Sequence, residues 1–121
     1  MQKKRILIVD DDARNIFALT ATLRARSFEC LSSSSAAEAI RLLEEGEKVD
    51  AVLLDMMMPE MDGYEAIPLL KNIPNKTNLP IIAVTAQAMK GDREKCLQAG
   101  ADDYISKPID VDKLLNVLSK I

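Results

Sequence analysis

The sequence predicts an α/β fold, a doubly wound sheet of five parallel strands with helices on both faces. Short apolar runs with the length of buried strands alternate with stretches whose apolar residues recur at helical spacing. Strands that alternate with helices of about ten or more residues pair in parallel, and the crossover helices cover both faces of the sheet. A length of 121 residues suits one hydrophobic core, so we expect residues 1–121 to form a single domain.

The expected strands are the apolar runs. They lie at residues 6–9, near 30–31, at 51–54, at 81–84 and, more weakly, at 103–105. The third run is the most informative, because its four apolar residues end abruptly at Asp55. Pro59 and the Asp62-Gly63 pair then break any regular continuation. An aspartate directly after a buried strand is held rigidly, with its side chain facing whatever opens at the end of the sheet.

The first, second and fifth helices follow from the spacing of apolar residues. The first spans about residues 13–26. The second and fifth have apolar residues at i, i+3, i+4 and i+7, which are Ala36, Ala39, Ile40 and Leu43 and then Val111, Leu114, Leu115 and Leu118. Ser35 and Glu38 have the spacing of a capping box, which predicts that the second helix begins directly after Ser35.

The third helix carries conflicting signals. Asp62 and Glu65 form an acidic variant of the capping box, which predicts a start at Gly63. Pro68 would then lie inside the helix, where a proline costs roughly 3 kcal/mol. Either the third helix begins late, near Ile67, or it is kinked at the proline.

The fourth helix is expected to span about residues 88–98. Met89, Cys96 and Leu97 would face the core. Gly100 lies where the end of a helix requires a left-handed residue.

Composition excludes several classes of function. The chain contains no histidine, so Ser-His or Cys-His catalysis, histidine metal ligation and phosphohistidine formation on this chain are excluded. A net charge of −3, no tryptophan and 3% aromatic residues argue against nucleic-acid binding. No apolar run reaches membrane-spanning length, and the N-terminal residues lead directly into a strand, unlike a signal peptide. Cys30 and Cys96 lack metal or redox spacing, so we expect reduced packing residues in a cytoplasmic protein without membrane contact.

Chemically distinctive residues follow the expected strands. Asp10 and Asp11 follow the first strand, Asp55 the third and Lys107 the fifth, and Thr85 lies at the end of the fourth. In doubly wound sheets, ligands bind beyond the carboxyl ends of the strands, where the strand order reverses. With the order 2-1-3-4-5 these four strands are neighbours, so we expect the five side chains to meet at one edge. Each alone could be a helix cap, a turn residue or a solvated charge.

The residue types indicate the chemistry. Three clustered carboxylates repel by about 4 kcal/mol per pair in a surface-like dielectric, so positive charge is needed. Lys107 supplies one charge, and a hard divalent cation is the natural second, because oxygen ligands suit Mg²⁺ better than Zn²⁺. An aspartate can attack phosphorus and carry the phosphoryl group as an acyl phosphate, with catalysis by positioning and charge neutralisation.

Four segments make the sequence similar to the response-regulator receiver domains of two-component signalling. They are ILIVDDD at residues 6–12, LDMMMPEMDG at 54–63, AVTA at 83–86 and DYISKP at 103–108. The resemblance covers the whole chain and implies a flavodoxin-like fold. Chemotaxis members of this family are known to have the strand order 2-1-3-4-5, so that order comes from the resemblance and not from the alternation of elements.

The resemblance also implies roles for individual residues. Asp55 would be the phosphoacceptor, with Lys107 pairing with the phosphoryl group. Asp11, Asp55 and the backbone carbonyl of Met57 would ligate Mg²⁺, with Asp10 acting through a bound water. The Thr85 hydroxyl would move to form a hydrogen bond with the phosphoryl group. Thr85 would be the first of two switch residues. Lys107 and Pro108 would be joined by a cis peptide bond.

The second switch residue implied by the family is Tyr104. It would swing inward behind Thr85 and change the face made by the fourth helix, fifth strand and fifth helix. A downstream protein or a dimer partner would bind that face. The resemblance implies a histidine kinase or a histidine phosphotransfer domain as phosphodonor, and because the chain lacks histidine, the phosphoryl group must come from another domain or molecule. The resemblance implies no enzyme activity beyond self-catalysed phosphotransfer and dephosphorylation on Asp55.

The sequence also bears on the protein to which the domain belongs and on three alternative functions. Residues 86–93 and 96–104 most resemble receivers attached to hybrid sensor histidine kinases, and the alternatives are a stand-alone regulator and a piece of a larger protein. A flavin binder is disfavoured by the three aspartates after the first strand, which would repel a flavin phosphate. A haloacid-dehalogenase-type phosphatase needs a second carboxylate where Met57 stands. A receiver-like interaction module that is never phosphorylated is the strongest alternative.

Overall fold

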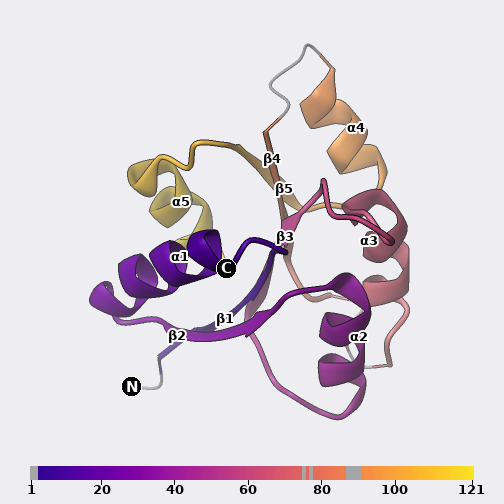
Figure 1. Ribbon diagram of the computed structural model, residues 1–121, viewed down its shortest axis with the longest axis horizontal. Helices are drawn as coiled ribbons and strands as arrows, with labels where there is room; N and C mark the ends of the chain where they lie inside the picture. Colours follow the sequence, from indigo (N-terminus) through magenta and orange to yellow (C-terminus); the bar gives the residue numbers. More distant parts are fainter. Residues whose placement is uncertain (1–2, 75, 77, 87–90) are drawn as a thin grey trace.

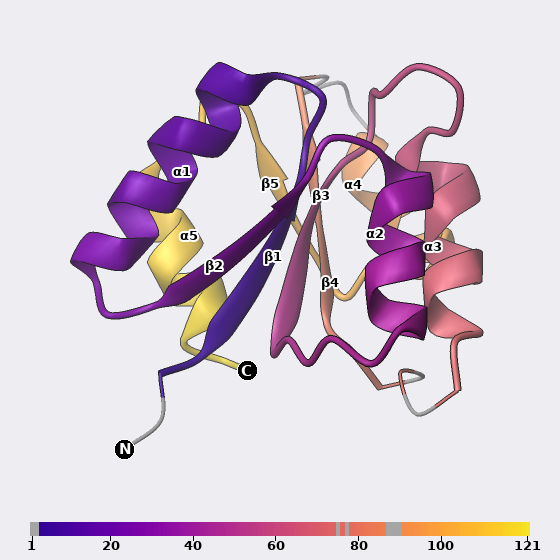
Figure 2. The same cartoon turned by 60° about the horizontal axis from the view of Figure 1, so that its bottom comes forward.

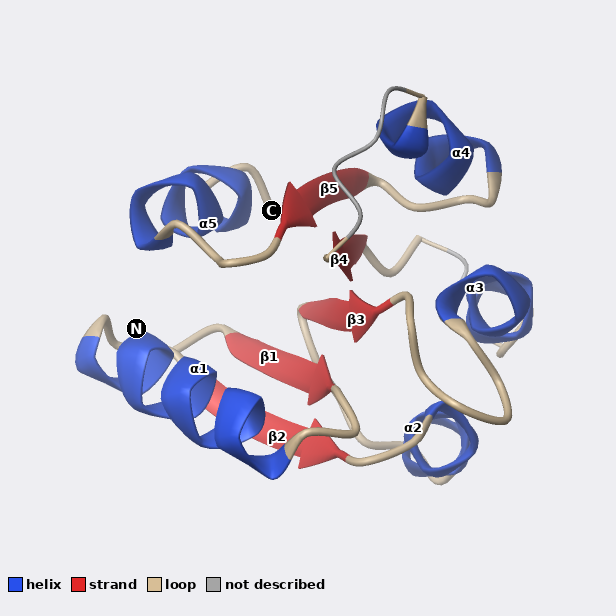
Figure 3. Ribbon diagram, turned by 45° about the horizontal axis from the view of Figure 1, so that its top comes forward, coloured by secondary structure: helices blue, strands red, loops and turns tan. Residues whose placement is uncertain are grey.

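The computed structural model describes residues 3–74, 76, 78–86 and 91–121. Strands and helices alternate throughout. Their bounds are β1 Arg5–Val9, α1 Ala13–Ala25, β2 Glu29–Ser33, α2 Ala36–Glu44, β3 Ala51–Asp55, α3 Gly63–Lys71, β4 Ile81–Thr85, α4 Asp92–Gln98, β5 Asp103–Ser106 and α5 Val111–Leu118. The strands pair in parallel in the order β2-β1-β3-β4-β5. Figure 1 labels the elements, and Figure 3 shows the order of the strands across the sheet. The predicted fold class and strand order are confirmed.

Two layers of helices cover the sheet. Helices α1 and α5 lie on one face, and α2, α3 and α4 lie on the other (Figure 2). Successive strand residues point to opposite faces, so each strand contributes to two cores. In β1, Ile6 and Ile8 join the core beneath α1 and α5, whereas Leu7 and Val9 join the core beneath the other three helices. Burial on both sides explains why the central strands are apolar at almost every position.

The predicted helix starts at Ser35 and Asp62 are confirmed. The Ser35 hydroxyl accepts the N–H of Glu38 at 3.1 Å, and the Asp62 carboxylate accepts the N–H of Glu65 at 3.0 Å. Helix α3 therefore begins at Gly63 and not near Ile67, so the late start considered above is wrong.

Pro68 lies inside α3, where it removes one helical hydrogen bond. Ala66, Ile67 and Leu70 are at most 1% exposed on the same helix. Burial of these three side chains and the Asp62 cap offset the cost of the proline.

Helix α4 is shorter than expected. It begins at Asp92, because Gly91 has a φ of 88°, which no α-helical residue adopts. The prediction of one helix over residues 88–98 is therefore wrong at Gly91. Met89 lies outside the described residues. Cys96 is fully buried, Leu97 is half-buried, and Gly100 has the predicted left-handed conformation with a φ of 115°.

The described helices are all short. The longest, α1, has 13 residues. Within residues 3–74, 76, 78–86 and 91–121, no helix combines the length and the apolar character needed to cross a membrane.

Candidate functional site

The carboxyl edge of the sheet brings the predicted site residues together. Asp10 directly follows β1, Asp55 is the last residue of β3, and Thr85 is the last residue of β4. Val9 pairs with Leu54 across the sheet, so the next residue of each strand, Asp10 and Asp55, are also neighbours. These residues therefore lie together at the edge of the sheet that the strand-end rule indicates, and their roles stay predictions.

Three carboxylates form the centre of the site. Asp10, Asp11 and Asp55 each contribute one carboxylate oxygen, and these oxygens all lie within 4.8 Å of one another. Asp10 and Asp55 are each only 4% exposed, whereas Asp11 is exposed. The cluster therefore combines two buried carboxylates with one that is exposed to solvent.

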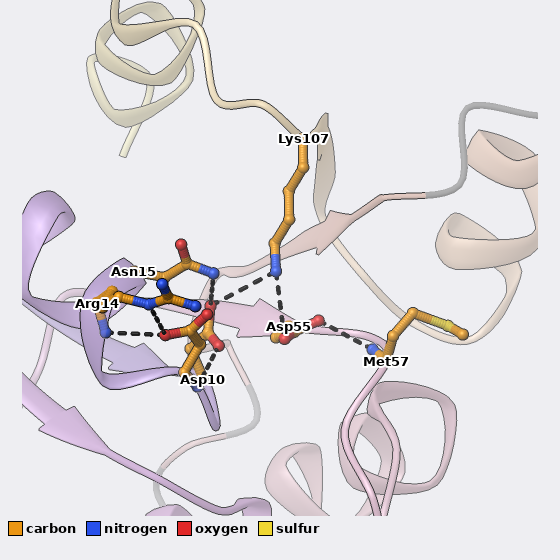
Figure 4. Close-up of polar contacts among 7 residues, drawn as sticks. Asp10, Arg14, Asn15, Asp55, Met57 and Lys107 are labelled. Carbon is orange, nitrogen blue, oxygen red and sulfur yellow. Dashed lines mark hydrogen bonds and ion pairs between the residues drawn. The ribbon is translucent and has the colours of Figure 1, made fainter.

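Lys107 links two of these carboxylates. Its ammonium nitrogen lies 3.3 Å from Oδ2 of Asp55 and 3.6 Å from Oδ2 of Asp10 (Figure 4). Asn15, in the first turn of α1, donates a weak hydrogen bond of 3.4 Å to the same oxygen of Asp10. The lysine neutralises one charge of the cluster and leaves an excess of negative charge.

The second oxygen of each buried carboxylate is bound by the backbone. Oδ1 of Asp10 accepts the N–H of Asp12 at 2.9 Å, and Oδ1 of Asp55 accepts the N–H of Met57 at 2.9 Å. Both are hydrogen bonds to the residue two positions ahead, which fix the orientation of an aspartate at the start of a turn. Both carboxylates consequently present Oδ2 toward Lys107 in a fixed geometry.

Burial dominates the acidity of Asp55. It raises the pKa of this carboxyl above its ordinary value, and the negative charge of Asp10 adds to the effect. The N–H of Met57 and the ammonium of Lys107 act in the opposite direction but do not cancel it. The folded protein therefore holds the Asp55 carboxylate at an energetic cost that a further cation would relieve.

The donor set fits a hard divalent cation. The clustered side-chain ligands are carboxylate oxygens, which Mg²⁺ prefers, and the region lacks the sulfur or imidazole ligands typical of zinc sites. Met57 lies in the loop after β3, two residues beyond Asp55, and donates its N–H to the Asp55 carboxylate, which places its backbone beside the cluster.

Thr85 and Tyr104 occupy neighbouring strands. Thr85 is 1% exposed and pairs with Ser106, and its carbonyl accepts the N–H of Lys107 at 2.7 Å. Tyr104 pairs with Ala83 and packs partly buried against the core beneath α2, α3 and α4. The peptide bond between Lys107 and Pro108 is cis, as the family resemblance implied.

The sequence pattern did not identify Asn15, a residue of α1 that contacts Asp10. Asn15 lies in the first turn of α1, the helix that begins at the site, and is five residues after Asp10. That position is the signal from which its contact with Asp10 could have been predicted. Asp12 belongs to the same run of aspartates but has a different role. It caps α1 by accepting the N–H of Arg14 at 2.9 Å.

Comparison with known proteins agrees with the fold and the site. The family model described as the response regulator receiver domain matches residues 6–119. The chain is 36% identical over 115 residues to the polar-differentiation response regulator DivK of Brucella ovis, covering 95% of this chain and 93% of DivK.

Solved structures give the same picture. The receiver domain of the sensor histidine kinase PA1611 from Pseudomonas aeruginosa, described with a magnesium ion coordinated in its active site cleft, matches with a TM-score of 0.87 and 36% identity, covering 98% of this chain and 96% of that domain. The Vibrio cholerae chemotaxis protein CheY4 matches with a TM-score of 0.89 over 98% of both chains, which at 22% identity supports the flavodoxin-like fold alone. On this evidence the chain belongs to the response regulator receiver domain family of two-component signalling systems.

Proposed function

We propose that this receiver domain accepts a phosphoryl group on Asp55 as one step of a phosphorelay, and that residues 1–121 act as one domain. The observation that carries the proposal is the fixed Asp55 carboxylate, which is buried, anchored by the N–H of Met57 and 3.3 Å from the ammonium of Lys107. A rigid carboxylate beside a cation is suited to attack an electrophilic phosphorus and to stabilise the anionic group that it receives.

The transfer step exchanges one bond to phosphorus for another. A carboxylate oxygen of Asp55 forms a bond to phosphorus, and the bond from phosphorus to the donor's histidine nitrogen breaks. The electron pair of that bond leaves with the imidazole. Lys107 pairs with the phosphoryl oxygens, which carry the charge of the transition state. No general base is required when Asp55 attacks as its carboxylate, the form that the Lys107 ammonium stabilises.

The acidic cluster would hold Mg²⁺. Asp11, Asp55 and the backbone carbonyl of Met57 would be ligands, and Asp10 would act through a bound water. Support comes from the oxygens of Asp10, Asp11 and Asp55, which lie within 4.8 Å of one another. When bound, Mg²⁺ would offset the negative charge of the carboxylates and of the incoming phosphoryl group.

The phosphodonor must be another protein or domain, because the chain has no histidine. Receiver domains interact with histidine kinases or phosphotransfer proteins, and either could supply the phosphohistidine. Beside Lys107 is an open pocket of about 440 Å³, whose walls include Ala18, Leu19 and Ile109. Helix α1 contributes Ala18 and Leu19 to these walls, and Phe17 of the same helix is 77% exposed. The apolar walls of this pocket, next to the acceptor, are a suitable docking site for the donor, and Phe17 adds a separate exposed apolar side chain on α1.

Phosphorylation would change the face made by α4, β5 and α5, to which a partner would bind. A phosphoryl group adds about −1.5 to −2 charge and three acceptor oxygens. The Thr85 hydroxyl would reorient toward these oxygens and Tyr104 would fill the space that it leaves. The change biases an equilibrium between two arrangements that the domain already samples. A downstream protein or a second copy of the domain would bind the altered face.

Two origins of the domain have support. Similarity to the PA1611 receiver favours a receiver belonging to a sensor histidine kinase. Similarity to DivK, which is named a response regulator, supports a receiver that belongs to a response regulator.

The experiment that tests the proposal is intact mass measurement after incubation with acetyl phosphate, with and without Mg²⁺. The wild type should gain one phosphoryl group only with Mg²⁺, and Asp55→Asn should gain none. Asp112→Asn, an exposed carboxylate at the start of α5, serves as the matched control and should behave as wild type. A wild type that takes up nothing from acetyl phosphate or from a histidine kinase would favour the unphosphorylated interaction module.

A further inference from the structure

Both tyrosines of the chain meet one buried carboxylate. The sequence contains two tyrosines, Tyr64 in the first turn of α3 and Tyr104 in β5. Tyr64 donates its hydroxyl proton to Oδ1 of Asp92 at 3.3 Å, and Tyr104 donates to Oδ2 of the same residue at 3.3 Å. Asp92 is the first residue of α4 and is 6% exposed. One carboxylate therefore joins three elements that are distant in the sequence.

The hydroxyl protons remain in place at physiological pH. Burial is the main cause that raises the pKa of Tyr64 and of Tyr104, and the charge of Asp92 raises both further. Each hydroxyl has a single proton to donate, so a Tyr64 hydroxyl that donates to Asp92 must act as acceptor toward Cys96, whose sulfur lies 3.8 Å away. Lys95 adds a cation–π contact, with its nitrogen 4.7 Å from the centre of the Tyr64 ring.

The positions of the two tyrosines connect this cluster to the acceptor site. Tyr64 lies at the start of α3, directly after the loop that leads from Asp55, and Tyr104 lies in β5, three residues before Lys107. Helices α3 and α4 lie on the same side of the sheet (Figure 3). Asp92 itself takes no part in the group of Asp10, Asp11 and Asp55. The contacts with Tyr64 and Tyr104 offer a route by which Asp92 can influence phosphorylation from outside that group.

We propose that Asp92 is a positioning residue for Tyr104, which holds the tyrosine ring in its unphosphorylated orientation and so restrains conversion to the phosphorylated arrangement. The inference rests on the proposed function of the domain, because the restraint matters only if Asp55 is phosphorylated. It adds to that function a second control on Tyr104, exerted from α4 and shared with Tyr64.

Linkage fixes the expected direction of the effect. A contact that is stronger in the unphosphorylated arrangement lowers the population of the other one. Removing the contact should raise that population and speed phosphoryl uptake. Two hydrogen bonds of 3.3 Å to a carboxylate are long for charge-assisted bonds, so we expect a change of about threefold.

The first experiment measures the rate of phosphoryl uptake from acetyl phosphate at saturating Mg²⁺ in a double-mutant cycle. Asp92→Ala should increase the rate about threefold, and Asp92→Asn, which keeps one acceptor oxygen, should give a smaller increase. In a Tyr104→Phe background, Asp92→Ala should change the rate much less, because Asp92 acts through Tyr104. Glu94→Gln, an exposed carboxylate on the same helix, is the matched control and should match the wild type.

Two results would overturn the inference. One is an unchanged or reduced rate in both Asp92 variants while wild type is phosphorylated normally. The other is the same fold-change for Asp92→Ala in the wild-type and Tyr104→Phe backgrounds. Mg²⁺ affinity should be equal in all variants, which separates a restraint on Tyr104 from general damage to the site.

The second experiment needs no phosphorylation. With ring-labelled tyrosine, the protein should give NMR signals from two rings, which Tyr64→Phe assigns. Asp92→Ala should shift both signals in the unphosphorylated protein, and Glu94→Gln should shift neither. Absence of phosphoryl uptake in the wild type would overturn the proposed function. A Tyr104 ring signal whose chemical shift is unchanged by Asp92→Ala would overturn the inference about Asp92.

Discussion

The ammonium nitrogen of Lys107 lies 3.3 Å from Oδ2 of Asp55, although the two residues are 52 positions apart in the sequence. The same nitrogen lies 3.6 Å from Oδ2 of Asp10. One lysine after β5 thus contacts carboxylates at the ends of β1 and β3. This arrangement accounts for both the stability of the acidic cluster and its proposed chemistry.

Replacing Lys107 should separate catalysis from metal binding. Lys107→Gln removes the cation that would pair with the phosphoryl oxygens, so phosphoryl uptake from acetyl phosphate should slow by about 10²–10³-fold. Mg²⁺ affinity should not fall, because the variant leaves more uncompensated negative charge around the ion. Uptake rates by intact mass and Mg²⁺ affinity by calorimetry test this. Equal losses of both properties would contradict the separate roles.

Mg²⁺ should stabilise the folded protein through Asp11. A ligand that binds only the folded state at 100 times its dissociation constant adds about 2.7 kcal/mol to the free energy of unfolding. Asp11 is exposed, so Asp11→Asn should leave the metal-free protein at least as stable as wild type while weakening the response to Mg²⁺. Urea unfolding with EDTA and with Mg²⁺ measures both effects. A full response to Mg²⁺ in Asp11→Asn would exclude this residue as a ligand.

Asp55→Asn should stabilise the metal-free protein at neutral pH. Burial raises the pKa of the folded Asp55 carboxyl above its unfolded value, so wild-type stability associated with this group is present at low pH and is lost as pH rises through the folded pKa. Asparagine cannot ionise and avoids that loss. The advantage of the variant should therefore shrink as pH falls, as measured by urea unfolding in EDTA across a pH series. A variant less stable than wild type at pH 7 would show that the Lys107 ion pair outweighs burial.

Gly63 should tolerate no side chain. A Cβ at this position would lie 2.2 Å from the sulfur of Met56 and 2.8 Å from the Met56 Cα. Gly63→Ala should lower the free energy of unfolding by about 1–3 kcal/mol, because the loop after β3 must move to make room. Met56→Ala removes the sulfur but not the backbone contact, so it should not rescue the variant. An unchanged urea midpoint for Gly63→Ala would contradict the close packing.

Much of the site could be predicted from the sequence because a parallel sheet brings the residues that follow its strands to one edge. Once the apolar runs are assigned to neighbouring strands, the residues after them must share one edge, which holds for Asp10, Asp55, Thr85 and Lys107. This reasoning needs only the ends of strands and no side-chain detail. The functional roles of these residues remain predictions until they are tested.

Helix boundaries were harder to predict because local signals compete. The penalty of Pro68 suggested a late start for α3, but the Asp62 cap and the burial of Ile67 favour the helix that begins at Gly63. In α4 the pattern of residues 88–98 is compatible with one helix, and only the positive φ of Gly91 fixes the start at Asp92. Glycine permits that conformation but does not by itself predict it.

The contacts of Asp92 could not be predicted from local pattern. Tyr64 is 28 positions and Tyr104 is 12 positions from Asp92, and the three residues meet only because α3, α4 and β5 pack together. An aspartate at the start of a helix is ordinarily exposed, so nothing in its immediate sequence marks it as buried.

The most direct test of phosphorylation at Asp55 is to locate the phosphoryl group chemically. Borohydride reduces an acyl phosphate to a primary alcohol, and peptide mass mapping of the phosphorylated, reduced protein then identifies the converted residue. Conversion of Asp55 to homoserine, dependent on Mg²⁺ and on acetyl phosphate, is the predicted result. Conversion at Asp10 or Asp11, with Asp55 recovered unchanged, would contradict the account.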